Sequence, residues 1–328
     1  MSLDITIGQK DMARIMAKAC TVVSDKSSKP IMGCAIIRAE NGALHVSSAD
    51  DNITIAITSR VACEVAKHGT IAVSAKDLLA RIQLHQPGPV RLVERSGKPE
   101  VIGIGTKRKH VLSTAIVADY PTLPVQDASI APIRLVSRSF ARIIAHVDYA
   151  ISTDVTRSNV NCASVEFDGT RMHVTGMDGS RLSTINALVA TDAPMKMLIQ
   201  QQSAIQLRKV IEGSRTDIES SNIDIAVSSA SMFFTIGGTC ICVKQVAAEY
   251  PAWRSAVPAR NKPFDIGRAK LIDMIRSAEV GSSNGVVMFD FGSAELRVWS
   301  KNETGESSDD TSISFDGKPY TSSFHAKY

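Results

Sequence analysis

An internal repeat with a period near 128 residues is the feature that most constrains what this chain can fold into. Residues 30–50 resemble residues 160–178 in the order of their apolar, small and polar positions. At a constant shift of 128, identical residues align, among them Cys34 with Cys162, His45 with His173, and Asp50 with Asp178. A period this long describes repeated domains, because solenoid units are shorter, about 20–50 residues.

Two further matches extend the repeat. Residues 118–121, Ala-Asp-Tyr-Pro, return as Ala-Glu-Tyr-Pro at 248–251, a shift of 130. A weaker third copy covers residues 285–302, in which Leu296 is shifted by 124 from Met172. We therefore predict three repeated domains with these bounds: 1–128, 129–259 and 260–328. The third repeat is incomplete, because about 40–50 residues that the period predicts are absent from its end.

The pattern within each repeat is mixed. Apolar residues recur at helical spacing in residues 7–23, 76–82, 140–151, 204–211 and 269–278. Short alternating or β-branched runs predict strands at 43–46, 54–61, 90–93, 101–105, 223–227 and 232–236. Turn signals that suit hairpins are Asn41-Gly42, Asp168-Gly169 and Asp316-Gly317. The predicted fold class is α+β, with three repeated domains that each place two helices against antiparallel sheets.

Composition places the chain among soluble globular proteins, with 44% apolar and 21% charged residues. The N-terminus lacks a basic region followed by an apolar stretch, and no apolar run approaches the roughly 18 residues that span a bilayer. We therefore expect a cytoplasmic protein. The six cysteines form no CxxC pair and have apolar neighbours, which favours reduced thiols in the core.

Residues that could support catalysis do not form a convincing set. Gly103-Ile104-Gly105 lacks the third glycine and the following helix of a dinucleotide site. His45 and His173 occupy equivalent positions of the repeat, which favours inherited sheet residues over a pair of ligands. Asp50-Asp51 and Asp309-Asp310 could bind a hard cation, although acidic pairs in loops are usually solvated. We expect no catalytic residue, cofactor or metal, and a metal-dependent DNA-processing enzyme is the remote alternative.

Several motifs in a fixed order carry a family resemblance along essentially the whole chain. They are Lys29-Pro30-Ile31-Met32-Gly33, Asp119-Tyr120-Pro121, Thr156-Arg157, Asp178-Gly179-Ser180-Arg181-Leu182 and the run from Tyr250 to Pro258. With the α+β repeats, they resemble the β subunit of bacterial DNA polymerase III, the sliding clamp. The resemblance implies a non-catalytic subunit that joins a second copy head to tail, forming a ring around duplex DNA with helices inside and sheets outside. It also implies binding of the DNA polymerase III core, other polymerases and the clamp loader.

The helices that the resemblance places along the hole carry most of the candidate DNA contacts. These are Lys10, Arg14 and Lys18 in the first helix, Lys76 and Arg81 in the second, Arg138 and Arg142 in the third, and Arg208 and Lys209 in the fourth. Lys26, after the first helix, and Arg157 match further family positions. The net charge of +4 does not indicate nucleic acid by itself. The alternative for this set is an ordinary solvated helix face.

Partners of the family insert a short apolar peptide into a cleft between the second and third domains. By motif match, its walls include Val160, Met177, Gly179, Ser180, Arg181, Leu182, Val257 and Pro258, with His325 and Tyr328 near the rim. Burying two or three side chains at about 25 cal/mol per Å² gives a useful but reversible affinity. The alternative is that these are ordinary strand-end and core residues. Ser180 replaces a histidine that is common in the family, and the family's final strands and tail have no counterpart.

Ring closure is expected to involve His110, Val111 and Leu112 in the first domain, and Ile275, Glu279 and Val280 in the third domain of a second copy. The family favours large apolar residues at these contacts, whereas His110 and Glu279 are polar, so we expect a weak dimer. Leu112→Asp is predicted to shift any dimer to monomer. A truncated paralogue that sequesters partners or forms mixed rings is the alternative function. The sequence leaves open which partners bind and whether the missing segment is natural.

Overall fold

The computed structural model describes residues 3–23, 27, 29–214, 222–259 and 263–328. The chain divides into two compact units, Met1–Pro251 and Ala252–Tyr328, here called unit 1 and unit 2. The sequence-based boundary at residue 128 lies inside unit 1, and the division into three domains stays a prediction. In the described part of the chain, every helix is too short or too polar to span a membrane.

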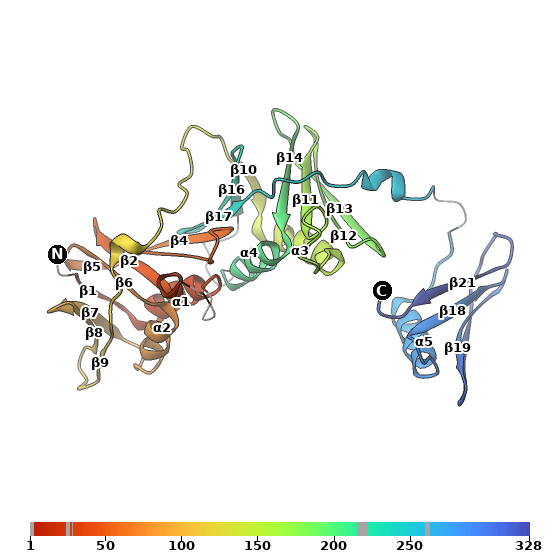
Figure 1. The fold of residues 1–328 in the computed structure, drawn as a ribbon, viewed down its shortest axis with the longest axis horizontal. Coiled ribbons are helices and arrows are strands. Elements are labelled where there is room, and N and C mark those ends of the chain that lie inside the picture. The colour runs from red at the N-terminus through yellow and green to blue at the C-terminus, as the bar shows by residue number, and fades with distance from the viewer. Residues whose placement is uncertain (1–2, 24–26, 28, 215–221, 260–262) are drawn as a thin grey trace. The chain divides into compact units, whose positions relative to one another are not determined.

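Unit 1 contains two successive runs of strands, each with two helices (Figure 1). The first run is β1 (Asp4–Gly8), α1 (Gln9–Cys20), β2 (Cys34–Glu40), β3 (Ala43–Ala49), β4 (Ile55–Ala62), β5 (Glu64–Lys67), β6 (Gly69–Ser74), α2 (Ala75–Gln83), β7 (Pro89–Arg95), β8 (Lys98–Gly103) and β9 (Lys109–Val111). The second run is β10 (Ile133–Val136), α3 (Ser137–Val147), β11 (Cys162–Phe167), β12 (Arg171–Met177), β13 (Leu182–Leu188), β14 (Met195–Gln200), α4 (Gln201–Gly213), β15 (Asn222–Val227), β16 (Ser231–Ile236) and β17 (Thr239–Lys244).

Unit 2 repeats the first part of this order. Its elements are α5 (Arg268–Val280), β18 (Val286–Phe291), β19 (Glu295–Asn302), β20 (Gly305–Ser312) and β21 (Tyr320–His325). The hairpins β2–β3, β11–β12 and β18–β19 occupy equivalent places, so the sequence repeat is a structural repeat. Residues 263–328 contain one α-helix, whereas the prediction for a complete repeat is two.

The predicted helices and strands are confirmed, with ends that differ by a few residues. Two of the predicted turns join hairpins. Asn41-Gly42 connects β2 to β3 with φ values of 48° and 68°, and Asp168-Gly169 connects β11 to β12. The prediction for Asp316-Gly317 was wrong, because β20 and β21 lie at opposite edges of their sheet and the turn belongs to the connection between those edges.

One eight-stranded antiparallel sheet joins the two runs of unit 1. Its order is β10-β15-β16-β17-β4-β3-β2-β6. The junction is the pair β17–β4, in register from Thr239 opposite Ser59 to Val243 opposite Ile55. The other two sheets of the unit are β5-β1-β7-β8-β9 and β13-β12-β11-β14. β9 and β13 are edge strands, so each has one side whose backbone groups can pair with a further strand.

The helices of unit 1 pack in pairs, α1 with α2 and α3 with α4. Each helix is amphipathic and buries one apolar face, which includes Met12 and Met16 of α1 and Phe140 of α3. α1 and α2 run antiparallel, because Nε2 of Gln9 at the start of α1 donates to the carbonyl oxygen of Ile82 at the end of α2 (3.1 Å).

Unit 2 is a four-stranded sheet, β20-β19-β18-β21, with α5 on one face. Met274 and Ala278 of α5 are fully buried against the sheet, where they pack with Phe289, Leu296 and Val298.

Candidate nucleic-acid interface and peptide-binding residues

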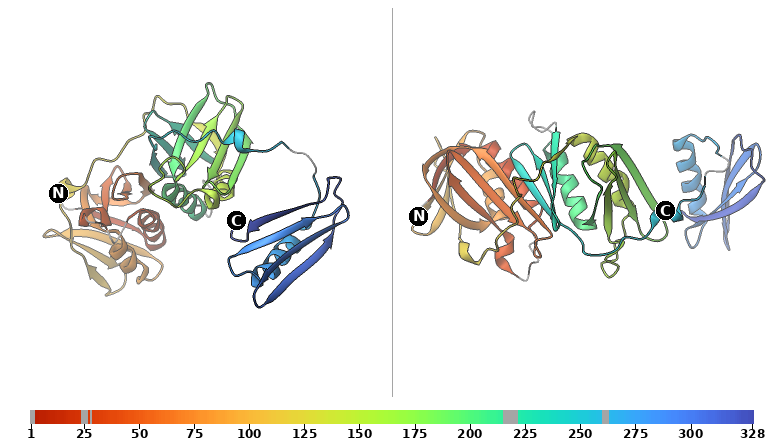
Figure 2. Two further views of the ribbon diagram at one scale, coloured as in Figure 1. Left: turned by 45° about the vertical axis from the view of Figure 1, so that its right-hand side comes forward. Right: turned by 90° about the horizontal axis from the view of Figure 1, so that it is seen from above.

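The four helices of unit 1 lie along one side of the unit, with the sheets behind them (Figures 1 and 2). The predicted basic residues recur on these helices at spacings that bring them to one face. Lys10, Arg14 and Lys18 are four residues apart on α1, and Arg138 and Arg142 are four apart on α3. Because each helix buries its apolar face, its basic side chains point away from the core.

Several of these charges already have a partner. The ion pairs are Arg14–Asp11 (3.0 Å), Arg81–Asp77 (3.0 Å) and Arg208–Asp148 (2.9 Å). Nζ of Lys18 donates to Oγ1 of Thr239 (3.2 Å), which holds its ammonium group against the sheet. These partners reduce the attraction of the four side chains for an anion.

Four of the basic residues on these helices combine exposure with the lack of an ion-pair partner in the described ranges. Lys10, Arg138, Arg142 and Lys209 are exposed, and none has an ion-pair partner among the residues that the structure describes. Lys76 is exposed as well, whereas Lys26 lies outside the described residues. Phosphate groups attract such cations whatever the base sequence, so this helical face suits the backbone of a nucleic acid.

The loop between β12 and β13 is held by Asp178. Its carboxylate accepts hydrogen bonds from the backbone N–H groups of Ser180 (2.8 Å) and Arg181 (3.0 Å) and from Nε of Arg181 (3.0 Å). Burial alone would raise the pKa of Asp178, but these hydrogen bonds and the charge of Arg181 outweigh it and hold the pKa below its ordinary value. Asp178 is therefore ionised at neutral pH and fixes the loop.

Arg157 contacts the same loop. Its Nη1 donates to the carbonyl oxygen of Asp178 (3.2 Å). A Cβ atom on Gly179 would lie 3.6 Å from the guanidinium, and the φ of 98° at this position suits glycine. The prediction for Arg157 is a DNA contact, and the structure brings this residue to the predicted peptide site.

The apolar residues predicted for the peptide site differ in exposure. Val160 is buried, with 2% exposed, whereas Met177 and Leu182 are half-buried. Sequence reasoning missed Tyr149, which is exposed. The guanidinium carbon of Arg181 lies over its ring, 5.5 Å from the ring centroid. The signal that could have found it is an aromatic residue directly after an amphipathic helix.

The remaining residues predicted for the peptide site belong to unit 2. Val257 and Pro258 are exposed and follow a short 3-10 helix, Trp253–Ala256. His325 and Tyr328 are also exposed, and their ring centroids are 5.8 Å apart. The structure therefore describes two sets of these residues, one in each unit.

The predicted ring contact of the first domain lies at the edge strand β9. Val111 is 47% exposed, whereas Leu112 is 6% exposed and packs in the core. His110 is half-buried beside His85, with ring centroids 5.2 Å apart. Leu112→Asp would therefore place a charge in the core and disturb folding, so Val111 is the better position for a test of association. In unit 2, Ile275 is half-buried, and Glu279 and Val280 are exposed.

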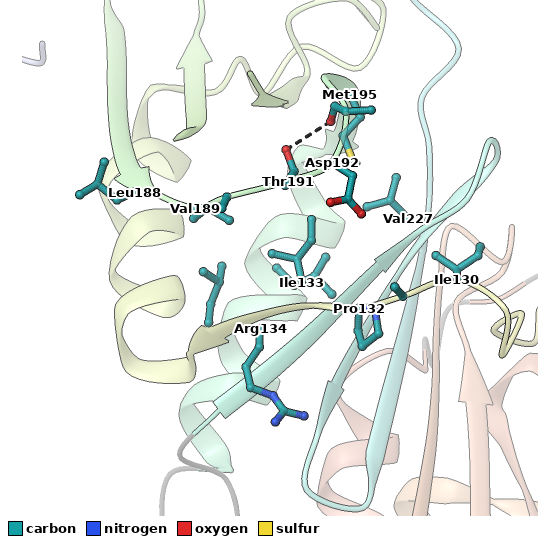
Figure 3. A pocket seen from close by; sticks show the side chains of 15 residues that line it. Ile130, Pro132, Ile133, Arg134, Leu188, Val189, Thr191, Asp192, Met195 and Val227 are labelled. Carbon is teal, nitrogen blue, oxygen red and sulfur yellow. Dashed lines mark hydrogen bonds between the residues drawn. The ribbon is translucent and has the colours of Figure 1, made fainter. Parts of the chain in front are cut away.

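A hollow that sequence reasoning did not predict lies in unit 1, between the start of β10 and the β13–β14 connection (Figure 3). Aliphatic side chains, among them Ile133, Leu188 and Val189, form most of its lining, and Arg134 and Asp192 add charged groups. None of the predicted site residues lines this hollow, so it adds no member to either candidate site.

The acidic pairs considered as cation ligands make contacts within the chain. Asp50 accepts a hydrogen bond from the backbone N–H of Ile55 (2.9 Å). It therefore holds its loop in the way that Asp178 holds the equivalent loop of the second repeat. Asp309 pairs with Lys270 (2.8 Å). The described residues contain no group of three or more His, Cys, Asp or Glu side chains that could hold a metal ion.

Two protein-family models together match most of the chain, and both describe domains of one protein. Residues 3–124 match the N-terminal domain of the DNA polymerase III beta subunit, and residues 134–252 match its central domain. The chain is 23% identical to the Beta sliding clamp of Caulobacter vibrioides over 338 residues, which cover 99% of this chain and 88% of that protein. It is 19% identical to the Beta sliding clamp of Vibrio cholerae, with 99% and 88% covered.

Solved structures share the fold. A DNA polymerase sliding clamp from Pseudomonas aeruginosa superposes with a TM-score of 0.89 at 16% identity, covering 99% of this chain and 87% of that one. A DNA polymerase III beta subunit from Thermotoga maritima gives a TM-score of 0.90 at 16% identity, with 99% and 88% covered. The predicted α+β fold of repeated domains is confirmed.

Proposed function

This chain belongs to the family of the DNA polymerase III beta subunit, and we propose that it acts as a sliding clamp that encircles duplex DNA and tethers polymerases to it. A clamp is not an enzyme. A closed ring stays on DNA by topology, so its contacts with the backbone can stay weak and independent of sequence. Its partners are duplex DNA, the DNA polymerase III core, other polymerases and the clamp loader, and its compartment is the cytoplasm.

The observation that carries this proposal is the helical side of unit 1. It presents Lys10, Arg138, Arg142 and Lys209 without ion-pair partners among the described residues. Exposed cations on rigid helices attract phosphates from either strand of a duplex without reading bases. Such a surface holds DNA loosely, which is what a sliding protein requires.

Ring closure has a template within the chain. β17, the last strand of the second run, pairs with β4 of the first run. The corresponding strands for ring closure are β9, which is the last strand of the first run, and β20, which occupies in unit 2 the position that β4 has in the first run. Both β9 and β20 are edge strands. We therefore expect β9 of one copy to pair with β20 of another. The charges at the two edges are opposite in sign, with Lys107, Arg108 and Lys109 at β9 and Glu306, Asp309 and Asp310 in β20. Lys109 already pairs with Glu100 (2.7 Å), and the three carboxylates pair with Arg297 or Lys270 within the chain, so these charges would have to exchange partners on ring closure.

Tethering is assigned to the loop between β12 and β13. Asp178 and Arg157 fix the loop, and Met177 and Leu182 add half-buried apolar surface beside it. A short apolar peptide gains affinity by burying its side chains on such a rigid surface. The loop is thus the part of unit 1 proposed to hold polymerases.

The proposal is tested by the length of DNA that polymerase III synthesises on a primed single-stranded circle with the clamp loader. We expect long products when this chain is present and short products when it is omitted. Products of unchanged length, with a loader that binds the chain, contradict the proposal.

Arg138→Glu combined with Arg142→Glu is expected to shorten these products, because the reversed charges repel phosphates. In direct binding to duplex DNA at low salt, the affinity should fall at least about tenfold, and the slope of log affinity against log salt should fall by about 2. Arg38→Glu combined with Arg60→Glu makes the same change of charge at exposed positions on β2 and β4 and serves as the control. An equal loss in both double variants places the DNA contacts elsewhere.

A further inference from the structure

The hollow beside β10 (Figure 3) lies at the place that β5 fills in the first repeat. β1 and β10 are equivalent, because each directly precedes the first helix of its repeat and their residues align at the shift of 128. Ile5 of β1 lies opposite Leu92 of β7, and Ile133 of β10 lies opposite Ile225 of β15. On its other side β1 pairs with β5, whereas β10 is the edge strand of its sheet. The second repeat, as far as the structure describes it, therefore leaves open an edge that the first repeat covers.

The connection between β13 and β14 could supply such a strand, but its backbone is held elsewhere. Residues 63–68, which include β5, and residues 189–194 are equal in length and align at a shift of 126. In the first repeat, Val65 pairs with Ile5. Its equivalent, Thr191, donates its backbone N–H to the carbonyl oxygen of Gly169 (3.0 Å), in the turn between β11 and β12. This hydrogen bond keeps the connection beside that turn, and the hollow stays open between the connection and β10.

The burial of β10 shows the effect of the missing neighbour. Ile5 and Ile7 of β1 are 0% and 4% exposed, whereas Ile133 and Leu135 at the equivalent positions of β10 are half-buried. The hollow beside them has a volume of about 590 Å³, and pockets that bind ligands typically enclose about 300–1,000 Å³. An open strand edge beside an apolar hollow is a place where an extended segment of another protein can add a strand.

β5 indicates which side chains such a segment carries. Val65 of β5 is half-buried and packs against the core of the first repeat. Lys67, two residues later, lies opposite Asp4 in the ladder and is exposed. By equivalence, a strand added to β10 places an apolar side chain opposite Ile133 and a basic side chain two positions later.

The charges at the hollow favour the same basic residue. Asp192 is exposed, and its carboxylate points from the β13–β14 connection toward β10 (Figure 3). Among the residues that the structure describes, Asp192 has no ion-pair partner. Arg134 also lines the hollow, but Asp224 holds its guanidinium through two hydrogen bonds (2.7 and 2.8 Å). The charge that remains available to an incoming segment is therefore negative.

Pro132 limits the length of the added strand. It occupies the place of Asp4, where the pairing of β1 with β5 already shifts its register. Proline has no backbone N–H to donate, and prolines on edge strands prevent long strands from pairing with them. A short ladder over Ile133–Val136 suits a brief, reversible contact with a partner segment better than stable pairing of two copies of this chain.

We propose that the hollow beside β10 binds an extended segment of a partner protein, which adds a short antiparallel strand to β10. The segment carries an apolar residue that enters the hollow against Ile133 and a basic residue that pairs with Asp192. β10 is not among the strands expected at the ring contact, and the hollow shares no residue with the loop assigned to tethering. A clamp that binds such a segment can therefore still close its ring and hold a polymerase.

Methyl NMR spectroscopy of the full chain, with labelled isoleucine and methionine methyl groups, tests the proposal. The probe is an acetylated and amidated peptide with the sequence of residues 64–69, which contains β5. Its addition should shift the methyl signals of Ile133, Ile225 and Met195, which line the hollow, in a saturable way. The same peptide with Val65→Asp should bind at least about tenfold more weakly, because its carboxylate would have to enter an apolar hollow.

A charge exchange tests the contact with Asp192. Asp192→Lys in the chain should weaken binding of the wild-type peptide about fivefold, because an exposed attraction becomes a repulsion. A peptide with Lys67→Glu should bind Asp192→Lys to within about twofold of the original affinity. Asp273→Lys makes the same change at an exposed position of α5, outside the hollow, and should leave the affinity unchanged.

Several results overturn the proposal. One is the absence of shifts at the hollow at every peptide concentration, and another is equal binding of the Val65→Asp peptide. Equal weakening by Asp192→Lys and Asp273→Lys, or failure of the exchanged pair to regain affinity, contradicts the contact with Asp192. Shifts of the same methyl signals on raising the concentration of the chain alone would assign the hollow to a second copy and also overturn the proposal.

Discussion

Val111→Asp is expected to prevent closure of the ring between the first domain of one copy and the third domain of another. Val111 is 47% exposed on the edge strand β9, and strand pairing across the ring contact would bury it. A carboxylate buried there without a partner costs about 3–5 kcal/mol. The expected loss is therefore roughly two to four orders of magnitude in the affinity of head-to-tail association.

Carbodiimide cross-linking between lysine and carboxylate side chains, followed by mass spectrometry, measures this contact. The wild type should give intermolecular links from Lys107 or Lys109 to Glu306 or Asp310, and Val111→Asp should lose them. Val125→Asp is the matched control, because this valine is 86% exposed between β9 and β10. Links that survive Val111→Asp show that β9 is not the closing edge.

Leu182→Asp is expected to abolish the binding of partner peptides. Leu182 is half-buried at the start of β13, directly after the loop that Asp178 holds. An apolar peptide that covers this position would have to desolvate the new carboxylate. The expected loss of affinity is at least about a hundredfold.

Fluorescence anisotropy with a labelled clamp-binding peptide measures this loss. Leu188→Asp makes the same exchange at the other end of β13, where the side chain is 78% exposed, and should bind the peptide as the wild type does. If Leu182→Asp retains wild-type affinity, the loop is not the peptide site. An equal loss in both variants would trace the effect to the strand rather than to Leu182.

The repeat was sufficient to predict the fold class, because copies of one pattern determine both the type and the order of the elements. The helices at 7–23 and 140–151 followed from apolar residues three or four positions apart, which must share a face. The pairing of β17 with β4 could not be predicted. The register between strands about 180 residues apart depends on how the domains pack, which local spacing does not encode.

The candidate sites were predictable to different degrees. The pair Arg81–Asp77 lies within one helical turn and can be derived from the sequence. The pair Arg208–Asp148 joins two distant elements and cannot. At β9, strand alternation predicts that Val111 and Leu112 face opposite sides, but which of them meets the core depends on α2 and the neighbouring strands.

Retention on circular and linear duplex DNA tests encirclement most directly. The chain is loaded onto a nicked circular plasmid with clamp loader and ATP, and the DNA is then cut once with a restriction enzyme. We predict that the chain stays on the intact circle in salt that disrupts backbone contacts, and leaves after cutting because a ring slides off a free end. Equal loss from circular and linear DNA, or retention after cutting, would show that the chain does not encircle DNA.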